Sequence, residues 1–122
     1  AGGHHKERRM TRKYEACFLL RPELSPEDLE KEAGVIQERI TANGGEMAHR
    51  EFWGKRTLTY PIAKKKEANF YVFYFTAATS AAPEIEKSVR GRENVMRHLM
   101  IVRKAFPAPK PQEAADGGPV AQ

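Results

Sequence analysis

The sequence has 122 residues, with 21 Lys and Arg against 16 Asp and Glu, and a formal net charge of +5. A chain of this length builds one domain with a modest core, and it has no apolar run near the roughly 20 residues that a membrane-spanning helix needs. Its single cysteine, Cys17, excludes an internal disulfide and suits a buried position in a reducing compartment. We therefore expect a cytosolic protein that is not inserted in a membrane.

The positive charge is unevenly distributed along the chain. Residues 21–45 carry three basic and six acidic side chains, whereas residues 46–104 carry twelve basic and six acidic ones. A local basic excess is typical of a surface that binds a polyanion. A mixed, well-solvated surface is the alternative interpretation.

Composition divides the chain into three parts. Residues 1–11 are interpreted as a basic N-terminal arm, or as residues added ahead of a natural start at Met10. Residues 12–104 are expected to form the domain. Residues 105–122 are rich in Pro, Ala and Gly and are expected to be a flexible tail, because they cannot bury enough apolar surface to order themselves.

Alternating apolar positions in residues 13–20 predict a first strand. Ser25 and Pro26 supply a cap and a first-turn proline for a helix over residues 26–42, whose apolar side chains recur at helical spacing. Residues 46–59 predict a long edge strand, in which Gly54 marks a bulge or bend. Residues 60–68 predict a lysine-rich hairpin loop.

Residues 70–75 are apolar at every position, a pattern typical of a central strand. A short helix is predicted from residue 81 or 82 to residue 90, and a fourth strand over residues 95–103. The order β-α-β-β-α-β predicts an α+β, ferredoxin-like fold: a four-stranded antiparallel sheet with both helices on one face. Strands one and three should be central, and the other sheet face should have no helix over it.

The central strand 70–75 is apolar on both sides, so one row of its side chains must lie on the open sheet face. If half of such a row stays exposed, its size usually marks an interaction site. We expect a protein partner to bind there. The alternative is that a loop or tail of the chain itself covers this row. The predicted partner-binding residues are Phe52, Trp53, Tyr71 and Phe73.

The hairpin lysines Lys64, Lys65 and Lys66 should project from its tip as point charges suited to phosphate contact rather than base recognition. Further basic residues near the second helix and fourth strand should lie close to the start of strand one. No catalytic triad, phosphate-binding glycine loop or metal-ligand spacing is present, so we expect no enzyme, no cofactor and no small-molecule substrate. His49 and His98 are interpreted as ordinary polar strand residues.

Four blocks of sequence resemble one family over residues 11–104. They are Tyr14-Glu15 with Leu19-Leu20-Arg21-Pro22, the block Trp53-Gly54-Lys55-Arg56-Thr57-Leu58-Thr59-Tyr60-Pro61-Ile62, then Asn69-Phe70-Tyr71, and Arg92-Glu93-Asn94-Val95-Met96-Arg97-His98. The chain is similar to bacterial small-subunit ribosomal protein six. The resemblance implies a structural protein of the ribosome without catalytic activity or cofactor.

The resemblance also implies partners and contact residues. Such a protein binds small-subunit ribosomal RNA in the central domain, or platform, as a pair with ribosomal protein eighteen. Positions at which the family tends to be basic fall here on Arg12, Lys13, Arg56, Arg92 and Arg97. Two alternatives stay open: a free-standing module similar to an RNA recognition motif, which stacks bases on the open sheet, and a small dimeric α+β enzyme with a pocket under the sheet.

Overall fold

The fold follows the predicted β-α-β-β-α-β order. The computed structural model describes residues 10–107 of the chain. The elements in chain order are β1 (Thr11–Leu20), α2 (Pro26–Ala42), β2 (Glu46–Ile62), β3 (Lys65–Ala78), α3 (Ala82–Val89) and β4 (Val95–Arg103). Most of the predicted arm (residues 1–11) and of the predicted tail (residues 105–122) therefore lies outside the described residues, although Thr11 already belongs to β1.

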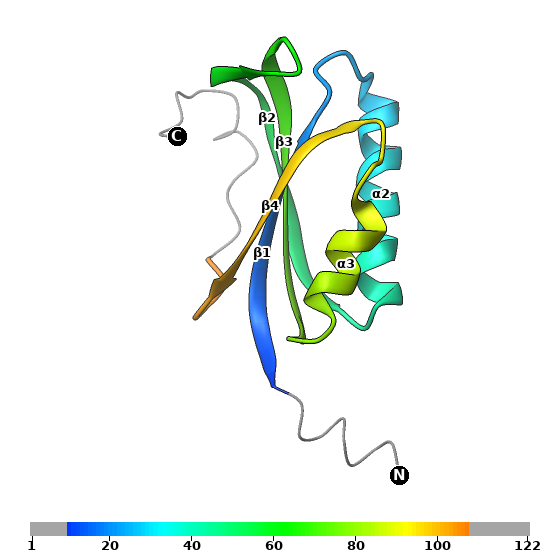
Figure 1. The fold of residues 1–122 in the computed structure, drawn as a ribbon, viewed down its shortest axis with the longest axis vertical. Helices are drawn as coiled ribbons and strands as arrows, with labels where there is room; N and C mark the ends of the chain where they lie inside the picture. Colours follow the sequence, from blue (N-terminus) through cyan, green and yellow to red (C-terminus); the bar gives the residue numbers. More distant parts are fainter. Residues whose placement is uncertain (1–9, 108–122) are drawn as a thin grey trace.

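The four strands form one antiparallel sheet in the order β2-β3-β1-β4. Strands β1 and β3 are therefore central and β2 and β4 form the edges, which confirms the predicted ferredoxin-like topology. Both helices pack against the same face of this sheet, and the opposite face carries no helix within residues 10–107 (Figure 1). We call these the helix face and the open face.

Helix α2 begins and ends where its sequence predicts. The Ser25 hydroxyl accepts a hydrogen bond from the backbone N–H of Asp28 at 3.1 Å, which caps the first turn that Pro26 opens. Its buried face includes Ala33, Ile36 and Ile40, each fully buried against the sheet. No helix in the described part is long and apolar enough to span a membrane.

The strand register decides which side chains reach the core. Tyr14 of β1 lies opposite Phe75 of β3, and Phe18 lies opposite Tyr71. All four side chains are buried in the core cluster beneath the helices. The even-numbered residues of β1 and the odd-numbered residues of β3 therefore form the helix face.

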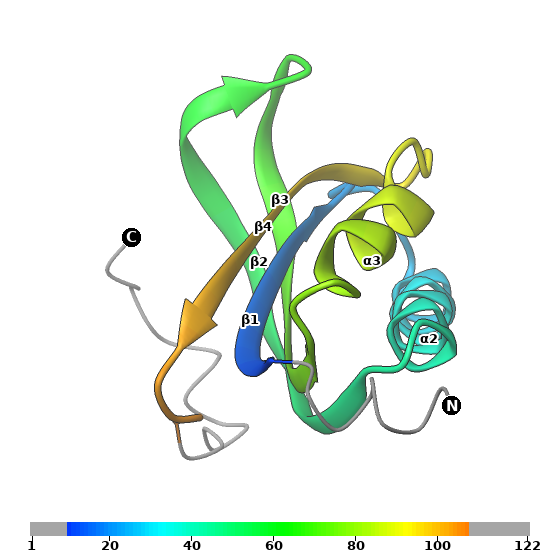
Figure 2. The same ribbon diagram turned by 60° about the horizontal axis from the view of Figure 1, so that its bottom comes forward.

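The hairpin between β2 and β3 is longer and tighter than predicted. Strand β2 continues to Ile62 and β3 starts at Lys65, so only Ala63 and Lys64 form the turn. Both have positive φ angles, 52° and 68°, the backbone geometry of a two-residue turn that matches strand twist. The hairpin extends well past the rest of the sheet (Figure 2), and the predicted loop over residues 60–68 is wrong for this reason.

Candidate nucleic-acid and protein interface

Two of the predicted partner-binding aromatics are core residues. Phe73 is fully buried and Tyr71 is only 6% exposed, because both point from β3 toward the helices. The Tyr71 hydroxyl donates a hydrogen bond to Glu30 at 3.0 Å. Burial, together with that carboxylate, raises the pKa of Tyr71 to about 12. The prediction that Tyr71 and Phe73 face a protein partner is therefore wrong.

The other two predicted aromatics lie on opposite sides of the sheet. Phe52 is half-buried on the helix face, with its ring 5.1 Å from that of Tyr71. Trp53 is half-buried on the open face, where its indole N–H donates to the Glu51 carboxylate at 2.8 Å. The strand register shifts between Phe52 and Gly54, which confirms the predicted bulge. Gly54 has φ of 93°, a conformation that favours glycine. Of the four predicted residues, Trp53 alone keeps a position suited to a partner.

The chain itself covers the aromatic row on the open face. Val72 is fully buried and Tyr74 is 2% exposed, so the expected exposed row is absent within residues 10–107. The His49 ring stacks on Tyr74 at 4.4 Å, and Phe106, which follows β4, meets Tyr74 edge-on at 6.0 Å. The alternative of a self-covered row is the correct one for β3.

Apolar surface on the open face belongs to β4 instead. Leu99 is 62% exposed and Ile101 is 40% exposed. Both lie opposite open-face residues of β1, because Leu99 pairs with Cys17 and Ile101 pairs with Glu15. The alternating pattern of residues 95–103 already indicated that one row of β4 side chains is exposed. The partner surface was instead predicted at the more aromatic strand, residues 70–75, so Leu99 and Ile101 were missed.

Cys17 is a structural thiol on this face. Burial raises the pKa of the Cys17 thiol to about 11, and the negative charge of Glu15 adds to the rise. At pH 8 only roughly one thiol in a thousand is then ionised. We expect Ellman's reagent to modify the folded protein far more slowly than the urea-unfolded protein at the same pH. Equal rates in the two states would contradict a half-buried, protonated thiol.

Arg92 of the predicted RNA-binding set is held by an ion pair. Its guanidinium donates through Nε and Nη2 to both carboxylate oxygens of Glu32, a residue of α2 that is 3% exposed. Asn94 donates to the same carboxylate at 3.3 Å. The Arg92 side chain joins the loop after α3 to α2, so its main contact is structural rather than with a ligand.

Two more predicted RNA-binding residues are also held within the fold. Lys65 forms an ion pair with Glu23, in the loop between β1 and α2. The Nε of Arg56 donates to the backbone oxygen of Trp53 at 2.9 Å, and its guanidinium lies over the indole ring at 5.8 Å. These contacts leave Lys65 and Arg56 less available than their sequence positions predict.

The remaining predicted basic residues are exposed. The side chains of Arg12, Lys64, Lys66 and Arg97 form no hydrogen bond or ion pair within the described chain, and the Lys13 ammonium only approaches the Phe106 ring, at 6.0 Å. They fall into two groups. Lys13 lies opposite Arg103 at one end of the sheet, whereas Arg97 lies opposite Leu19, six residues along β1 and about 20 Å away. The basic residues expected to lie together near the start of β1 are therefore divided between the two ends of the sheet, which we call the two basic margins.

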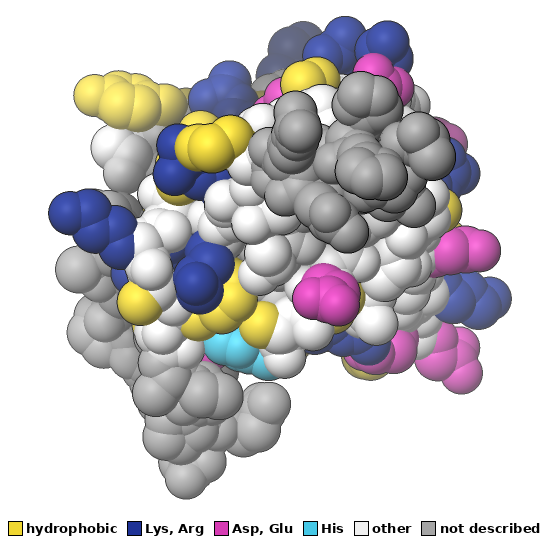
Figure 3. All heavy atoms as spheres, turned by 90° about the horizontal axis from the view of Figure 1, so that it is seen from below, with side chains coloured by type: hydrophobic (Ala, Val, Ile, Leu, Met, Phe, Trp, Pro, Cys, Tyr) yellow, Lys and Arg dark blue, Asp and Glu magenta, His cyan; other side chains and the backbone are white. Residues whose placement is uncertain are grey.

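Acidic side chains are unevenly distributed between the two sides of the molecule. Seen from below, basic side chains lie beside exposed hydrophobic ones at the left, on the open-sheet side, whereas most visible acidic side chains lie at the right, toward the helices, among further basic ones (Figure 3). On the helix side, the first turn of α2 carries the acidic residues Glu27 and Asp28. The open side thus combines positive charge with apolar surface, the combination that ribonucleoprotein contacts use.

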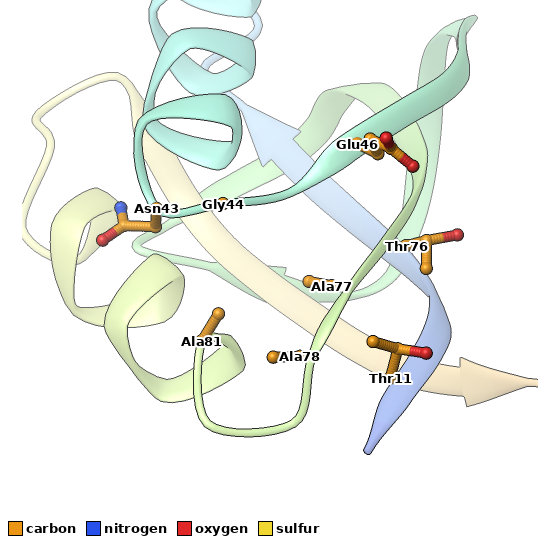
Figure 4. Close-up of a pocket in the computed structure, with 8 residues that line it drawn as sticks. All are labelled: Thr11, Asn43, Gly44, Glu46, Thr76, Ala77, Ala78 and Ala81. Carbon is orange, nitrogen blue, oxygen red and sulfur yellow. The ribbon is translucent and has the colours of Figure 1, made fainter. Parts of the chain in front are cut away.

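A shallow pocket of about 330 Å³ lies between the end of α2 and the ends of β1 and β3. The carboxylate of Glu46 and the hydroxyls of Thr11 and Thr76 point to one side, away from the Asn43 amide (Figure 4). In a catalytic or ligand site, by contrast, the polar groups converge on one point. Residues 10–107 also contain no group of His, Cys, Asp and Glu that could hold a metal ion.

Comparison with known proteins identifies the family. The family model described as ribosomal protein S6 matches residues 13–102. The small ribosomal subunit protein bS6 of Dictyoglomus turgidum is 39% identical over 91 residues, which cover 75% of this chain and 94% of that protein. The bS6 protein of Sulfurimonas denitrificans is 38% identical over 90 residues, or 74% of this chain and 66% of that protein.

A solved structure agrees with the sequence comparison. The crystal structure of 30S ribosomal protein S6 from Thermotoga maritima superimposes with a TM-score of 0.73 at 25% sequence identity. The superposition covers 77% of this chain and 89% of that one. The chain therefore belongs to the ribosomal protein S6 family, which consists of structural proteins of the small ribosomal subunit and not of enzymes.

Proposed function

We propose that this protein binds small-subunit ribosomal RNA in the central domain, or platform, together with ribosomal protein eighteen. In this role it is a structural part of cytoplasmic ribosomes. The observation that carries the proposal is the family match over residues 13–102, which includes both helices, β2 and β3 in full and most of β1 and β4. The exposed basic margins are the chemical support for it.

Phosphate contact is assigned to the exposed basic side chains. Lys64 and Lys66 at the hairpin end, Arg97 on β4, and Arg12 at the start of β1 all present charge to solvent. Lys and Arg heads in such positions neutralise phosphates and release counterions, which makes binding strong at low salt. The separation of the two margins suits RNA that follows the sheet over about 20 Å.

Protein contact is assigned to the open face near β4. Leu99 and Ile101 are exposed apolar side chains on an edge strand, between Arg97 and Arg103. An edge strand also offers unpaired backbone groups to an extended partner segment. We propose that ribosomal protein eighteen covers this strand. A weak protein contact and several phosphate contacts then reinforce each other, because the second forms at high effective concentration.

The free-standing alternative is less well supported. A module that stacks bases on its sheet needs aromatic rings exposed there. Here Tyr74 is 2% exposed and lies between His49 and Phe106. These neighbours leave no exposed face of the Tyr74 ring on which a base could stack.

The hairpin lysines provide the test of RNA contact. The double variant Lys64→Gln with Lys66→Gln should weaken binding to a transcribed central-domain RNA fragment and lower the slope of log affinity against log salt by roughly 0.9 per lost phosphate contact. The measurement is a filter-binding titration at several salt concentrations. Lys87→Gln, at an exposed position of α3 on the helix side, is the matched control. An unchanged slope in the double variant would show that the hairpin lysines do not contact RNA phosphates.

A further inference from the structure

A bulge near the end of the β2–β3 hairpin displays one aromatic ring. Thr57 pairs with Glu67, and the next printed pair is Ile62 with Lys65. Four residues of β2 therefore lie opposite Lys66 alone. Pro61 is one of the four and has no N–H to give to the ladder. Bulges of this kind bend a strand and re-aim its side chains.

The re-aimed side chain is Tyr60. It is 78% exposed, more than the other exposed large hydrophobic residues of the described chain, and it forms no ring contact within residues 10–107. The fold therefore gains little packing from this ring. A single exposed apolar residue is common, so its surroundings decide whether it can act in recognition.

Those surroundings are strongly basic. Residues 55–67 hold five basic side chains against one acidic one, a net charge of +4. Lys64 and Lys66 are exposed beside the bulge. The one acidic residue, Glu67, directly follows Lys66 in β3. An aromatic ring flanked by cations suits a base with a phosphate on each side better than it suits an apolar protein surface.

The hairpin is also held in place by contacts with the loop after β1. Asn69 is 2% exposed and donates through its side-chain amide to the backbone oxygen of Arg21 at 2.9 Å. The Lys65 ammonium pairs with Glu23 in the same loop after β1. Lys65 directly follows the turn, so this ion pair ties the hairpin end to the loop after β1 and makes Lys65 a positioning residue. A hairpin held in this way loses less entropy when its end binds. The hairpin extends past the other strands of the sheet (Figure 2).

From these observations we infer that Tyr60 stacks on an unpaired RNA base while Lys64 and Lys66 contact the neighbouring phosphates. The inference rests on the proposed function and adds a single-stranded, stacked nucleotide to it. The base has to be unpaired, because a base inside a duplex does not expose its face to a side chain. Stacking tolerates any base, so the ring adds affinity and position rather than sequence recognition.

Three substitutions at Tyr60 separate stacking from other contacts. The full chain with ribosomal protein eighteen is titrated onto the transcribed central-domain RNA fragment. Tyr60→Ala and Tyr60→Leu should each weaken binding about 5- to 150-fold, the range for loss of one base–aromatic stack. Tyr60→Phe keeps the ring and should bind within about twofold of the original protein. Because Tyr60 is exposed, all three should melt at nearly the original temperature.

The outcomes decide between this inference and the proposed function. Original affinity in Tyr60→Leu would show that the ring does not stack, and would overturn the inference. Loss of affinity for protein eighteen in an RNA-free assay, with RNA affinity intact, would assign Tyr60 to the protein contact and overturn it equally. If the lysine variant flattens the salt slope and the Tyr60 variants behave as the original, only the stacking inference fails. If the original protein shows no salt-sensitive binding, the proposed function and the inference fail together.

Discussion

Replacing Phe73 by Ala should lower the free energy of unfolding by about 3–5 kcal/mol, the usual cost of emptying a phenylalanine site in a core. Phe73 is fully buried, and its ring meets Phe18 edge-on at 5.5 Å and stacks with Tyr71 at 5.6 Å. Truncation removes both ring contacts and leaves a cavity beneath the helices. Equilibrium unfolding in urea, followed by circular dichroism, measures the loss.

Leu99→Ala is the matched control for Phe73→Ala. Leu99 is 62% exposed on β4, so its truncation should change the unfolding free energy by only about 0.5 kcal/mol. It should instead weaken the binding of ribosomal protein eighteen. The reverse pattern is a Phe73→Ala variant that keeps its stability but no longer binds ribosomal protein eighteen. That result would place Phe73 at the partner surface and contradict its position on the helix face.

The second large effect is expected from Arg92→Ala, which should destabilise the protein by about 3 kcal/mol at neutral pH, the low end for a broken buried pair. The variant leaves Glu32, 3% exposed, with Asn94 as its remaining side-chain hydrogen-bond donor among the described residues. Arg92 itself is 29% exposed, which argues against a larger value. Arg97→Ala is the control: an exposed arginine whose loss should spare stability and weaken RNA binding.

The pH dependence of the Arg92 effect has a definite sign. Burial raises the pKa of Glu32, but the hydrogen bonds from Arg92 and Asn94 outweigh it, so the pKa is lowered in the folded state. The unfolded chain therefore binds more protons than the folded protein as the pH falls through the ordinary carboxyl range, about pH 4. The ion pair stabilises the fold above that range and loses its contribution below it. The difference in the free energy of unfolding between Arg92→Ala and the original protein should become smaller in acid. A constant difference from pH 7 to pH 3 would contradict this assignment.

Most of the fold could be predicted because local signals agreed with the global arrangement. Ser25 and Pro26 mark the start of α2, and the apolar spacing that follows matches the buried residues of the helix. The predicted limits of residues 95–103 coincide with β4. Right-handed crossovers then leave only one sensible strand order, and the structure has that order.

The face of β3 could not be predicted from its own residues. Both of its rows are apolar, so alternation alone gives no preference between Phe73 and Tyr74. The pairing with β1 decides it: Tyr14 and Phe18 are more apolar than Glu15 and Cys17, and their opposite residues go under the helices with them. That register joins strands far apart in sequence, where no tight turn fixes the alignment.

The basic residues show the same limit. Lys64 and Arg92 look alike as charges in a sequence, yet one is exposed in a turn and the other is paired with a buried carboxylate. The partners Glu32 and Arg92 lie 60 residues apart, and only the packing of α2 against the loop after α3 brings them together. Long-range ion pairs of this kind leave no local pattern.

The most direct test of the account is the affinity of the full chain for the central-domain RNA fragment, measured with and without saturating ribosomal protein eighteen. We predict that the partner tightens RNA binding at least about tenfold, since the two contacts share one rigid domain. We also predict that the Leu99→Ala variant loses most of that gain while keeping its RNA affinity alone. An RNA affinity that protein eighteen leaves unchanged would contradict the proposed joint binding.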